Sequence, residues 1–212
     1  MKIAVITYDV NHKKTQDILI RLMGKDVTVI ATPFKERKPI KKLYWHRPNM
    51  VTNISTPHLC KCFGFDYIKH NNPIEIINKM DVALIGGCGL INTGDVNIIN
   101  AHPGYLPFCR GLDALKWAIY NGYPIGVTTH TINSEIDSGY LIEHELIQVG
   151  FYDTFHSVAI RQYEKEIEML VRAINKPVGD KIFNGHHEPN KRMPIELEPI
   201  MMQRFNNLRI EK

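Results

Sequence analysis

The chain has 212 residues, of which 44% are hydrophobic and 23% are charged, and its formal net charge is +4. These values are usual for one soluble globular domain, and they exclude a disordered chain, a collagen and a coiled coil. A charge of +4 is too small to indicate nucleic-acid binding, which needs basic residues clustered on one face. It does suit a protein whose ligand is anionic.

Targeting signals and cysteine motifs are weak in this sequence. No apolar run approaches the ~20 residues that a membrane-spanning helix needs, and residues 1–7 are typical of a first strand rather than of a signal peptide. The four cysteines include Cys60 and Cys62 in a CxC, a poor zinc motif without a second pair. We therefore expect a cytoplasmic protein with unpaired cysteines, no metal, and neither a membrane nor a nucleic-acid partner.

The first part of the chain alternates strands with helices. The predicted elements are, in order, a strand (2–7), a helix ended by Gly24 (13–23), a strand (27–31), a helix capped by Ser55 (55–63), a strand (66–69) and a helix that starts with Asn72 as N-cap and Pro73. This βαβ opening predicts an α/β fold with a mostly parallel sheet.

A basic segment interrupts that alternation. Residues 34–50 hold six lysines and arginines against one acid, Glu36. Two interpretations stay open: a solvated surface loop, or a contact to an anionic substrate through lysines such as Lys41 and Lys42.

The second part continues with strands and ends in a long helix and a tail. The predicted elements are strands over 81–87 and 96–100, a helix over 112–120, strands over 125–131 and 140–148, a helix capped by Asp153 that stops before Pro177, and a short helix over 199–205. We expect one domain over residues 1–176 and a tail over 177–212 that packs on it or on a partner subunit.

A glycine-rich stretch follows the predicted strand over 81–87. The sequence Gly86-Gly87-Cys88-Gly89-Leu90-Ile91 lacks the third glycine and the clear following helix of a dinucleotide fingerprint. Either these glycines only form a tight turn, or their backbone contacts a flat heterocycle.

The segment after the next strand carries the chemistry. Asn100 and His102 are two residues apart, so their side chains project to the same side of a strand at its carboxyl end, where open α/β sheets bind ligands. Asp137 lies in a turn between two later strands and can reach back to an imidazole. His130 lies mid-strand and is expected to be structural, and His186-His187 to form a polar loop rather than a metal pair.

Three motifs together resemble one family. Asn100 to Gly111 reads Asn-x-His-Pro-x-x-Leu-Pro-x-x-Arg-Gly, and it is followed by Gly126-Val127-Thr128-Thr129-His130 and by Asp137-Ser138-Gly139. This pattern resembles the 10-formyltetrahydrofolate-dependent formyltransferases. The resemblance implies a Rossmann-like formyltransferase fold, a twisted sheet flanked by helices, with Asn100, His102 and Asp137 as the catalytic trio.

The resemblance also implies a cofactor site and loop details. The folate, a co-substrate, would lie over the strand end, with its pterin held by Cys88, Gly89, Leu90, Asn133 and Ser134. It favours a cis bond at Leu106–Pro107. Gly104 stands where many members have Ser, which bears on the shape of the loop.

Formyl transfer gives each member of the trio a role. The amine of the acceptor attacks the formyl carbon, and Asn100 can donate an N–H to the oxyanion that forms, a contribution on the order of 100- to 1000-fold in such sites. His102 can assist the oxyanion and handle protons near neutral pH. Asp137 can orient the imidazole and take the amine proton, directly or through a water.

The acceptor is expected to be a nucleotide-linked amino sugar, with the product used in a surface polysaccharide such as lipopolysaccharide. Similarity of residues 111–117 to the sugar-modifying branch favours this choice, and Thr7–Asn11 lacks the phosphate loop of glycinamide ribonucleotide transformylases. That purine-pathway activity and a non-catalytic folate- or nucleotide-binding protein remain alternatives, and a homodimer is expected.

Positive charge for a diphosphate would come from Arg110, Lys116, Lys41 and Lys42. Arg is better suited than Lys to bidentate phosphate contact, so Arg110 is the first candidate. Its rival role is to brace the loop by bonding to backbone carbonyl groups.

Overall fold

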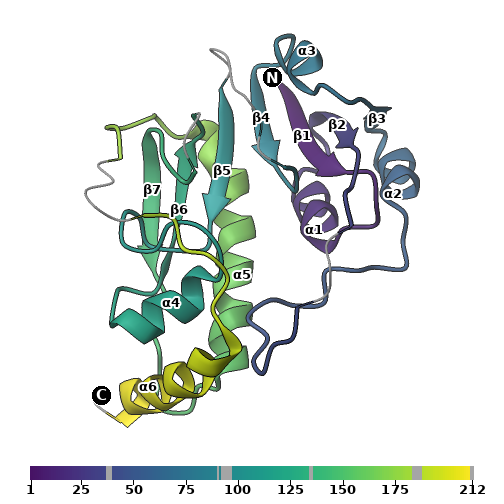
Figure 1. Ribbon diagram of the computed structural model, residues 1–212. Coiled ribbons are helices and arrows are strands. Elements are labelled where there is room, and N and C mark those ends of the chain that lie inside the picture. The colour runs from purple at the N-terminus through teal and green to yellow at the C-terminus, as the bar shows by residue number, and fades with distance from the viewer. Residues whose placement is uncertain (37–39, 90, 92–96, 134–135, 183–187, 211–212) are drawn as a thin grey trace.

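The computed structural model describes residues 1–36, 40–89, 91, 97–133, 136–182 and 188–210 (Figure 1). Within these residues the strands are β1 (Lys2–Tyr8), β2 (Asp26–Thr32), β3 (Asp66–Lys69), β4 (Val82–Ile85), β5 (Ile98–His102), β6 (Gly126–Thr131) and β7 (Leu141–Leu146). They form one sheet in the order β3-β2-β1-β4-β5-β6-β7. Neighbours from β3 to β5 run parallel, and β6 and β7 are antiparallel. The predicted α/β class with a mostly parallel sheet is confirmed.

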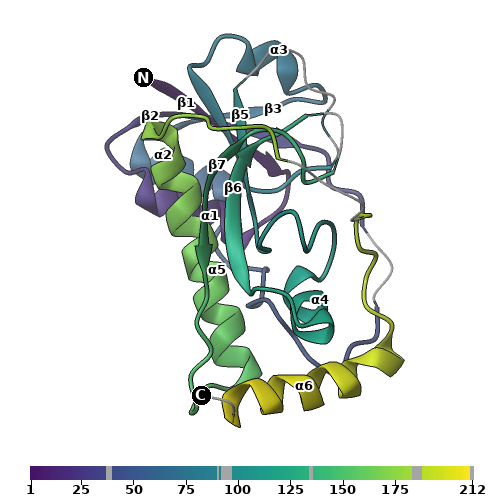
Figure 2. The ribbon, with the colours of Figure 1, turned by 90° about the vertical axis from the view of Figure 1, so that its left-hand side faces the viewer.

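Helices flank this sheet. They are α1 (Lys13–Arg21), α2 (Thr56–Phe63), α3 (Ile74–Ile77), α4 (Ala114–Asn121), α5 (Phe155–Arg172) and α6 (Glu198–Ile210), with 3-10 turns at Ala173–Asn175 and Ile195–Leu197. In Figure 2, α5 and α4 lie on opposite sides of β6, and α6 crosses below both. No helix of the described residues is long and apolar enough to cross a bilayer.

Apolar side chains fill both faces of the central strands. On one face, α1 and α5 bury Ile18, Leu19 and Leu170 against β1, β2 and β4. On the other face, Ile77 of α3 packs on Ala4 and Ile6. A central parallel strand buried on both sides needs continuous hydrophobic sequence, which β1 and β4 have.

Two helix starts differ from the expected residues. Pro73 rather than Asn72 is the N-cap of α3, and Asn72 instead donates its amide to Glu75. Thr154 rather than Asp153 caps α5, because extended backbone at Thr154 lets its hydroxyl accept from Ser157 N in a capping box. Asp153 is used one step earlier, where it accepts from the backbone N–H of Gly150 at 2.7 Å.

The C-terminal helix α6 packs against the rest of the chain. Met201 and Phe205 are fully buried, and the ring of Phe205 meets Phe155 of α5 edge-on with centroids 5.8 Å apart. The helix is longer than the expected 199–205. A domain boundary at residue 176 stays a prediction, as does contact with a partner subunit.

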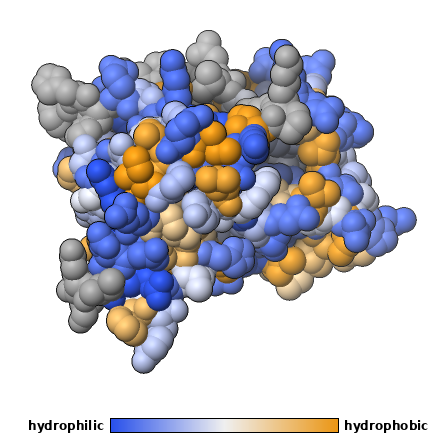
Figure 3. Space-filling model, turned by 60° about the horizontal axis from the view of Figure 1, so that its bottom comes forward, coloured by the Kyte–Doolittle hydropathy of each residue, from blue (hydrophilic) through white to orange (hydrophobic). Residues whose placement is uncertain are grey.

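Viewed with its bottom turned forward, the surface shows hydrophobic and hydrophilic side chains that alternate in small groups (Figure 3).

Candidate active site

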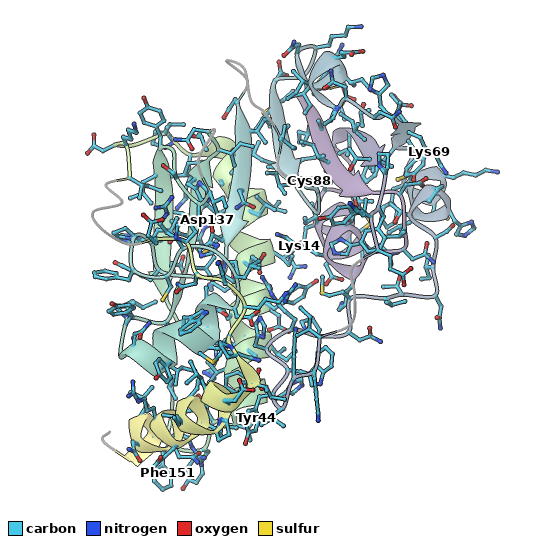
Figure 4. The ribbon with its side chains drawn as sticks, viewed as in Figure 1. Lys14, Tyr44, Lys69, Cys88, Asp137 and Phe151 are labelled. Atoms are coloured by element: carbon cyan, nitrogen blue, oxygen red, sulfur yellow. The ribbon has the colours of Figure 1, made fainter. Side chains whose placement is uncertain are left out.

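A cavity of about 950 Å³ lies where β1 and β5 end, between the half of the molecule with β1–β4 and the half with β5–β7. Asn100, His102 and Gly111 line one end of it, and the irregular segment 45–51 lines the other. In Figure 4, Lys14 and Cys88 lie on the β1–β4 side of the gap, and Asp137 lies in the opposite half. This position, outside the carboxyl ends of parallel strands, is where open α/β sheets bind ligands.

His102 and Asp137 form a buried pair. Nδ1 of His102 lies 3.3 Å from Oδ1 of Asp137, and Nε2 of His102 donates to the carbonyl oxygen of Cys109 at 2.6 Å. Oδ2 of Asp137 accepts from the backbone N–H of Gly111 at 2.6 Å. Both neighbours of the imidazole are acceptors, an arrangement that suits the imidazolium form, with a proton on each ring nitrogen.

The pKa values of this pair move in opposite directions. Burial opposes the charge on His102, but the carboxylate of Asp137 and the carbonyl of Cys109 leave its pKa raised above the ordinary value. Burial likewise opposes the charge on Asp137, yet the nearby imidazolium and the N–H of Gly111 lower its pKa to about 2. Near neutral pH the carboxylate of Asp137 is therefore ionised, and it favours the protonated form of the His102 ring at the cavity wall.

Asn100 is oriented by a histidine on the neighbouring strand. His130 lies directly opposite Asn100 in the antiparallel pair of β5 and β6, and Nδ2 of Asn100 lies 3.4 Å from Nε2 of His130. Nδ1 of His130 faces the carbonyl oxygens of Thr131 and Ser138 at 2.8 and 3.0 Å, so the proton is on Nδ1 and Nε2 accepts. Burial lowers the pKa of His130, which keeps this ring neutral. Asn100 therefore has one amide N–H held and one free to donate.

The loop that follows β5 packs against His102 and fixes the position of its side chain. Leu106–Pro107 is a cis bond, as expected. A Cβ on Gly104 would lie 2.6 Å from Nε2 of His102, so the loop follows this path only with glycine there. Gly111 has φ +84°, and a Cβ on it would lie 2.4 Å from the carbonyl oxygen of Asn190, which bridges to the tail.

A second buried carboxylate holds two cations beside the cavity. Glu166 of α5 is 1% exposed, Lys14 Nζ lies 2.7 Å from its Oε1, and Arg47 donates to its Oε2. Burial alone would raise the pKa of Glu166, but Arg47 and Lys14 lower it to about 2. Lys14 comes from α1 and Arg47 from the basic segment, so one carboxylate connects three parts of the chain at the cavity wall.

Two more acids lie against the basic segment, and one of them, Glu198, is hydrogen-bonded to it. Oε2 of Glu198 accepts from the backbone N–H groups of Leu43 and Tyr44 at 2.7 and 3.0 Å, while its Oε1 pairs with Lys116. Asp113 lies 3.6 Å from Nε2 of His46 and 3.5 Å from a guanidinium nitrogen of Arg192. Residues 42–51 of the chain are therefore held against the cavity and are not a freely solvated loop.

The expected substrate cations are placed differently from one another. Lys42 lines the cavity, whereas Lys41 is exposed outside it. Lys116 is fully buried against Glu198, so it cannot reach a bound molecule, which corrects the expectation for this residue. Arg110 donates from Nε and Nη2 to the carbonyl of Ile136, at 3.1 and 2.6 Å. These bonds brace the loop, which is the alternative to phosphate binding for this residue.

The expected pterin contacts are only partly described. Cys88 lines the cavity, and its carbonyl accepts from the hydroxyl of Tyr8 at 2.6 Å. Gly89 is exposed beside it, and Asn133 donates to the hydroxyl of Ser138 at 3.3 Å. Leu90 and Ser134 lie outside the described residues, as do His186 and His187. The pterin site stays a prediction.

Sequence reasoning did not single out several groups that shape the cavity. The sequence predicts only a structural role for His130, because its place opposite Asn100 depends on strand register, which one sequence does not give. Glu166 lies on α5 at a position that the helical pattern would assign to the apolar face, so a charge in an apolar stripe was the available signal. Across the described residues there is no group of three His, Cys, Asp or Glu side chains that could hold a metal ion.

Comparisons with known proteins place the sequence similarity around the site. Residues 80–174 match the family described as formyl transferase. A dTDP-4-amino-4,6-dideoxyglucose formyltransferase of Mycobacterium bovis is 30% identical over 103 residues, 46% of this chain and 43% of that protein. A phosphoribosylglycinamide formyltransferase of Bacillus subtilis is 27% identical over 107 residues, 50% of this chain and 55% of that protein. The matches span about half the length of these curated relatives.

Solved structures share the fold over nearly the whole chain. An N-formyltransferase of Helicobacter canadensis, in complex with folinic acid and dTDP-3-aminofucose, superposes with a TM-score of 0.66 at 14% identity, covering 97% of this chain and 80% of that one. A 4-N formyltransferase of Francisella tularensis gives a TM-score of 0.63 at 18% identity, covering 96% and 87%. The formyl transferase match over residues 80–174 includes Asn100, His102 and Asp137, and the fold of the chain is similar to that of these solved N-formyltransferases.

Proposed function

We propose that the protein transfers a formyl group from 10-formyltetrahydrofolate to the amine of a nucleotide-linked amino sugar. The observation that carries this proposal is the meeting of Asn100 and the His102–Asp137 pair at one end of a cavity of about 950 Å³. Its volume lies at the upper end of the ≈ 300–1,000 Å³ that is usual for small-molecule sites.

The chemistry assigns a task to each group. The amine nitrogen bonds to the formyl carbon, and the tetrahedral intermediate places negative charge on the formyl oxygen. The free N–H of Asn100 and Nε2–H of His102 donate to this oxygen, for which Nε2 exchanges its bond to the Cys109 carbonyl. The carbon–nitrogen bond to the folate then breaks, and the folate nitrogen receives the proton that the amine loses, with Asp137 holding the imidazolium in place.

The choice of acceptor rests on the cavity and on the relatives. Lys14, Lys42, Arg47 and Arg192 line the cavity, which suits an anionic substrate. Two similar proteins carry dTDP-linked amino sugars in their names, one as the substrate and one as a bound ligand. Use of the product in a surface polysaccharide, a cytoplasmic location and a homodimer stay predictions.

The test is a direct assay of turnover. Purified protein is incubated with 10-formyltetrahydrofolate and one amine at a time. The amines are dTDP-4-amino-4,6-dideoxyglucose, dTDP-3-aminofucose and glycinamide ribonucleotide. Product masses are measured by mass spectrometry. We expect a mass gain of one formyl group in place of hydrogen on an amino sugar nucleotide and none in Asn100→Ala. A better turnover with glycinamide ribonucleotide would replace this acceptor, and no product with any amine would leave a non-catalytic binding protein.

A further inference from the structure

The rim of the cavity opposite the catalytic trio is formed by segment 42–51, which the formyl-transfer chemistry does not use. Lys42 and residues 45–51 line it, and its polar groups face the same space as Asn100 and His102. A substrate whose amine reaches the trio would extend its remaining groups toward this rim. The properties of the rim therefore report on what the acceptor carries beyond its amine.

The charges at the rim are unbalanced. Lys14 and Arg47 share one carboxylate, Glu166, and Arg192 approaches Asp113 beside Lys42. Leaving out the histidines, of which His102 is offset by Asp137, the described cavity-lining side chains include four cations and two acids, an excess of two positive charges. A nucleoside diphosphate linked to a sugar carries two negative charges, so the excess matches its diphosphate.

An aromatic ring stands beside these cations. Trp45 lines the cavity although its side chain is 64% exposed, and Nζ of Lys42 lies 5.1 Å from its ring centroid. An exposed tryptophan at a cavity mouth offers a stacking face to a nucleobase. Lys42, next to the ring of Trp45, is close enough to contact the phosphate group that follows the nucleoside.

One buried atom at the rim has no hydrogen-bond partner among the described residues. The side chain of His46 is 10% exposed, its Nε2 points to Asp113, and its Nδ1 is buried with no hydrogen-bond partner in the described part of the chain. Burial and the surrounding cations lower the pKa of His46 to about 2, so the ring is neutral and Nδ1 can accept a hydrogen bond. A buried acceptor without a partner is costly unless a bound group supplies a donor.

The rim is also preorganised. Backbone N–H of Lys13 donates to the carbonyl of Met50 at 2.8 Å, Gln16 donates to the carbonyl of Ile54 at 2.7 Å, and Glu198 holds the other end at Leu43 and Tyr44. A loop fixed at both ends loses little freedom on binding, which favours affinity.

From these contacts we infer that segment 42–47 binds the nucleoside diphosphate of the acceptor, with the base stacked on Trp45 and the diphosphate between Lys42 and Arg47. The inference rests on the proposed function for its orientation, since the amine must reach Asn100 and His102. It goes further in naming the residues that recognise the nucleotide, and these residues can be tested without turnover.

The experiment measures binding of dTDP, UDP, GDP and ADP, and of inorganic pyrophosphate, to protein without folate. The chain has two tryptophans. Trp117 does not line the cavity, and its indole N–H donates to the carbonyl of Lys191. In Trp117→Phe the fluorescence therefore reports on Trp45 alone, and we expect at least one nucleoside diphosphate to quench it and pyrophosphate to bind without stacking.

Variants separate stacking from charge. Trp45→Leu should weaken nucleoside diphosphate binding by about tenfold and leave pyrophosphate binding unchanged, as measured by calorimetry. Lys42→Ala should weaken both several-fold, and Lys41→Ala, its exposed neighbour outside the cavity, should weaken neither. Both Trp45 and Lys42 are solvent-accessible, so their replacement leaves the fold in place, which the melting temperature checks.

The outcomes distinguish this inference from the proposed function. No quenching of Trp45 by any of the four nucleotides, or unchanged binding in both Trp45→Leu and Lys42→Ala, overturns the inference. If the protein formylates an amino sugar nucleotide and those variants keep the wild-type KM for it, the proposed function stands and only the inference about segment 42–47 is wrong. If nucleotides bind through Trp45 and no amine is formylated, the inference stands and the proposed function is wrong.

Discussion

The two ends of the cavity are held in place by different means. At the catalytic end, backbone groups orient the side chains: the N–H of Gly111 holds Asp137, and the carbonyl of Cys109 holds His102. These partners are separated by 26 and 7 residues. At the rim, buried carboxylates of α5 and α6 hold the loop, with Glu166 separated from Arg47 by 119 residues and Glu198 from Leu43 by 155.

This difference separates catalysis from stability. A group held by backbone bonds in a short loop can be removed at little cost to the remaining fold. A buried carboxylate that holds two cations cannot, because its removal leaves charges buried without a partner. Substitutions at the catalytic end should therefore act chiefly on the rate, those of the buried carboxylates that hold the rim on stability, and those of exposed rim residues on acceptor affinity.

The largest effect on rate is expected at Asn100. Asn100→Ala removes the amide donor to the oxyanion, and turnover should fall by about 100- to 1000-fold. The melting temperature should stay within a few degrees, because the side chain is half-buried and, within the described residues, makes one long hydrogen bond, to His130. Steady-state formylation kinetics check the rate, with Asn121→Ala on the exposed end of α4 as the matched control. Near-normal turnover would remove Asn100 from the catalytic trio.

The largest effect on stability is expected at Glu166. Glu166→Gln leaves Lys14 and Arg47 without their shared carboxylate, and the free energy of unfolding should fall by about 3 kcal/mol, the lower end for a buried pair because Arg47 is partly exposed. Urea denaturation measures the loss, and Glu164→Gln on the exposed face of the same helix should cost almost nothing. Equal stability of the two variants would contradict a structural role for the buried carboxylate.

Most of the fold could be predicted from the sequence because its signals are local. The strand over 66–69 and the helix over 56–63, with its cap at Ser55 and its stop at Gly64, lie where turn residues and apolar spacing place them. The caps of α3 and α5 were displaced by one residue, because a cap depends on local backbone angles that composition does not determine. The continuation of β5 to His102 reflects pairing with β6, a tertiary contact.

The site divides in the same way. Asn100, His102 and Asp137 form a recognisable motif, since the chemistry requires those residue types near strand ends. The cations could not be assigned, because Lys116, Arg110 and Lys42 look alike in the sequence and differ in their partners. Lys116 is buried against Glu198, Arg110 braces Ile136, and Lys42 faces the cavity. Only the tertiary structure separates these outcomes.

A smaller effect, on acceptor affinity alone, is expected from Glu198. The double variant Lys116→Met/Glu198→Leu removes the buried charges together with the acceptor for the Leu43 and Tyr44 N–H groups, so the rim loosens. Lys116→Met/Glu198→Gln removes the same charges and keeps a carbonyl acceptor. We expect KM for the amino sugar nucleotide to rise several-fold only in the first variant, with KM for the folate unchanged in both. Equal acceptor KM values would show that Glu198 does not position the rim.

The smallest effect concerns the pH dependence of stability at the catalytic end. The raised pKa of His102 makes its contribution complete below its unfolded pKa of about 6.5 and lost as pH rises through the folded value. The lowered pKa of Asp137, about 2, makes its contribution complete above an unfolded pKa of about 3.9 and lost as pH falls toward 2. The pair should therefore stabilise the fold most between about pH 4 and 6.5.

Asp137→Asn removes the carboxylate from this pair and tests the assignment. The melting temperature of wild type minus that of the variant, measured across pH 3 to 9, should be largest in that window and smaller on both sides. NMR titration of the histidine ring nitrogens should show a lower pKa for His102 in Asp137→Asn and no change in Asp180→Asn, an exposed aspartate in the tail. A difference in melting temperature that does not vary with pH would mean that His102 is neutral in the fold. The Nε2–H of His102 would then lack the positive charge that strengthens a hydrogen bond to an oxyanion.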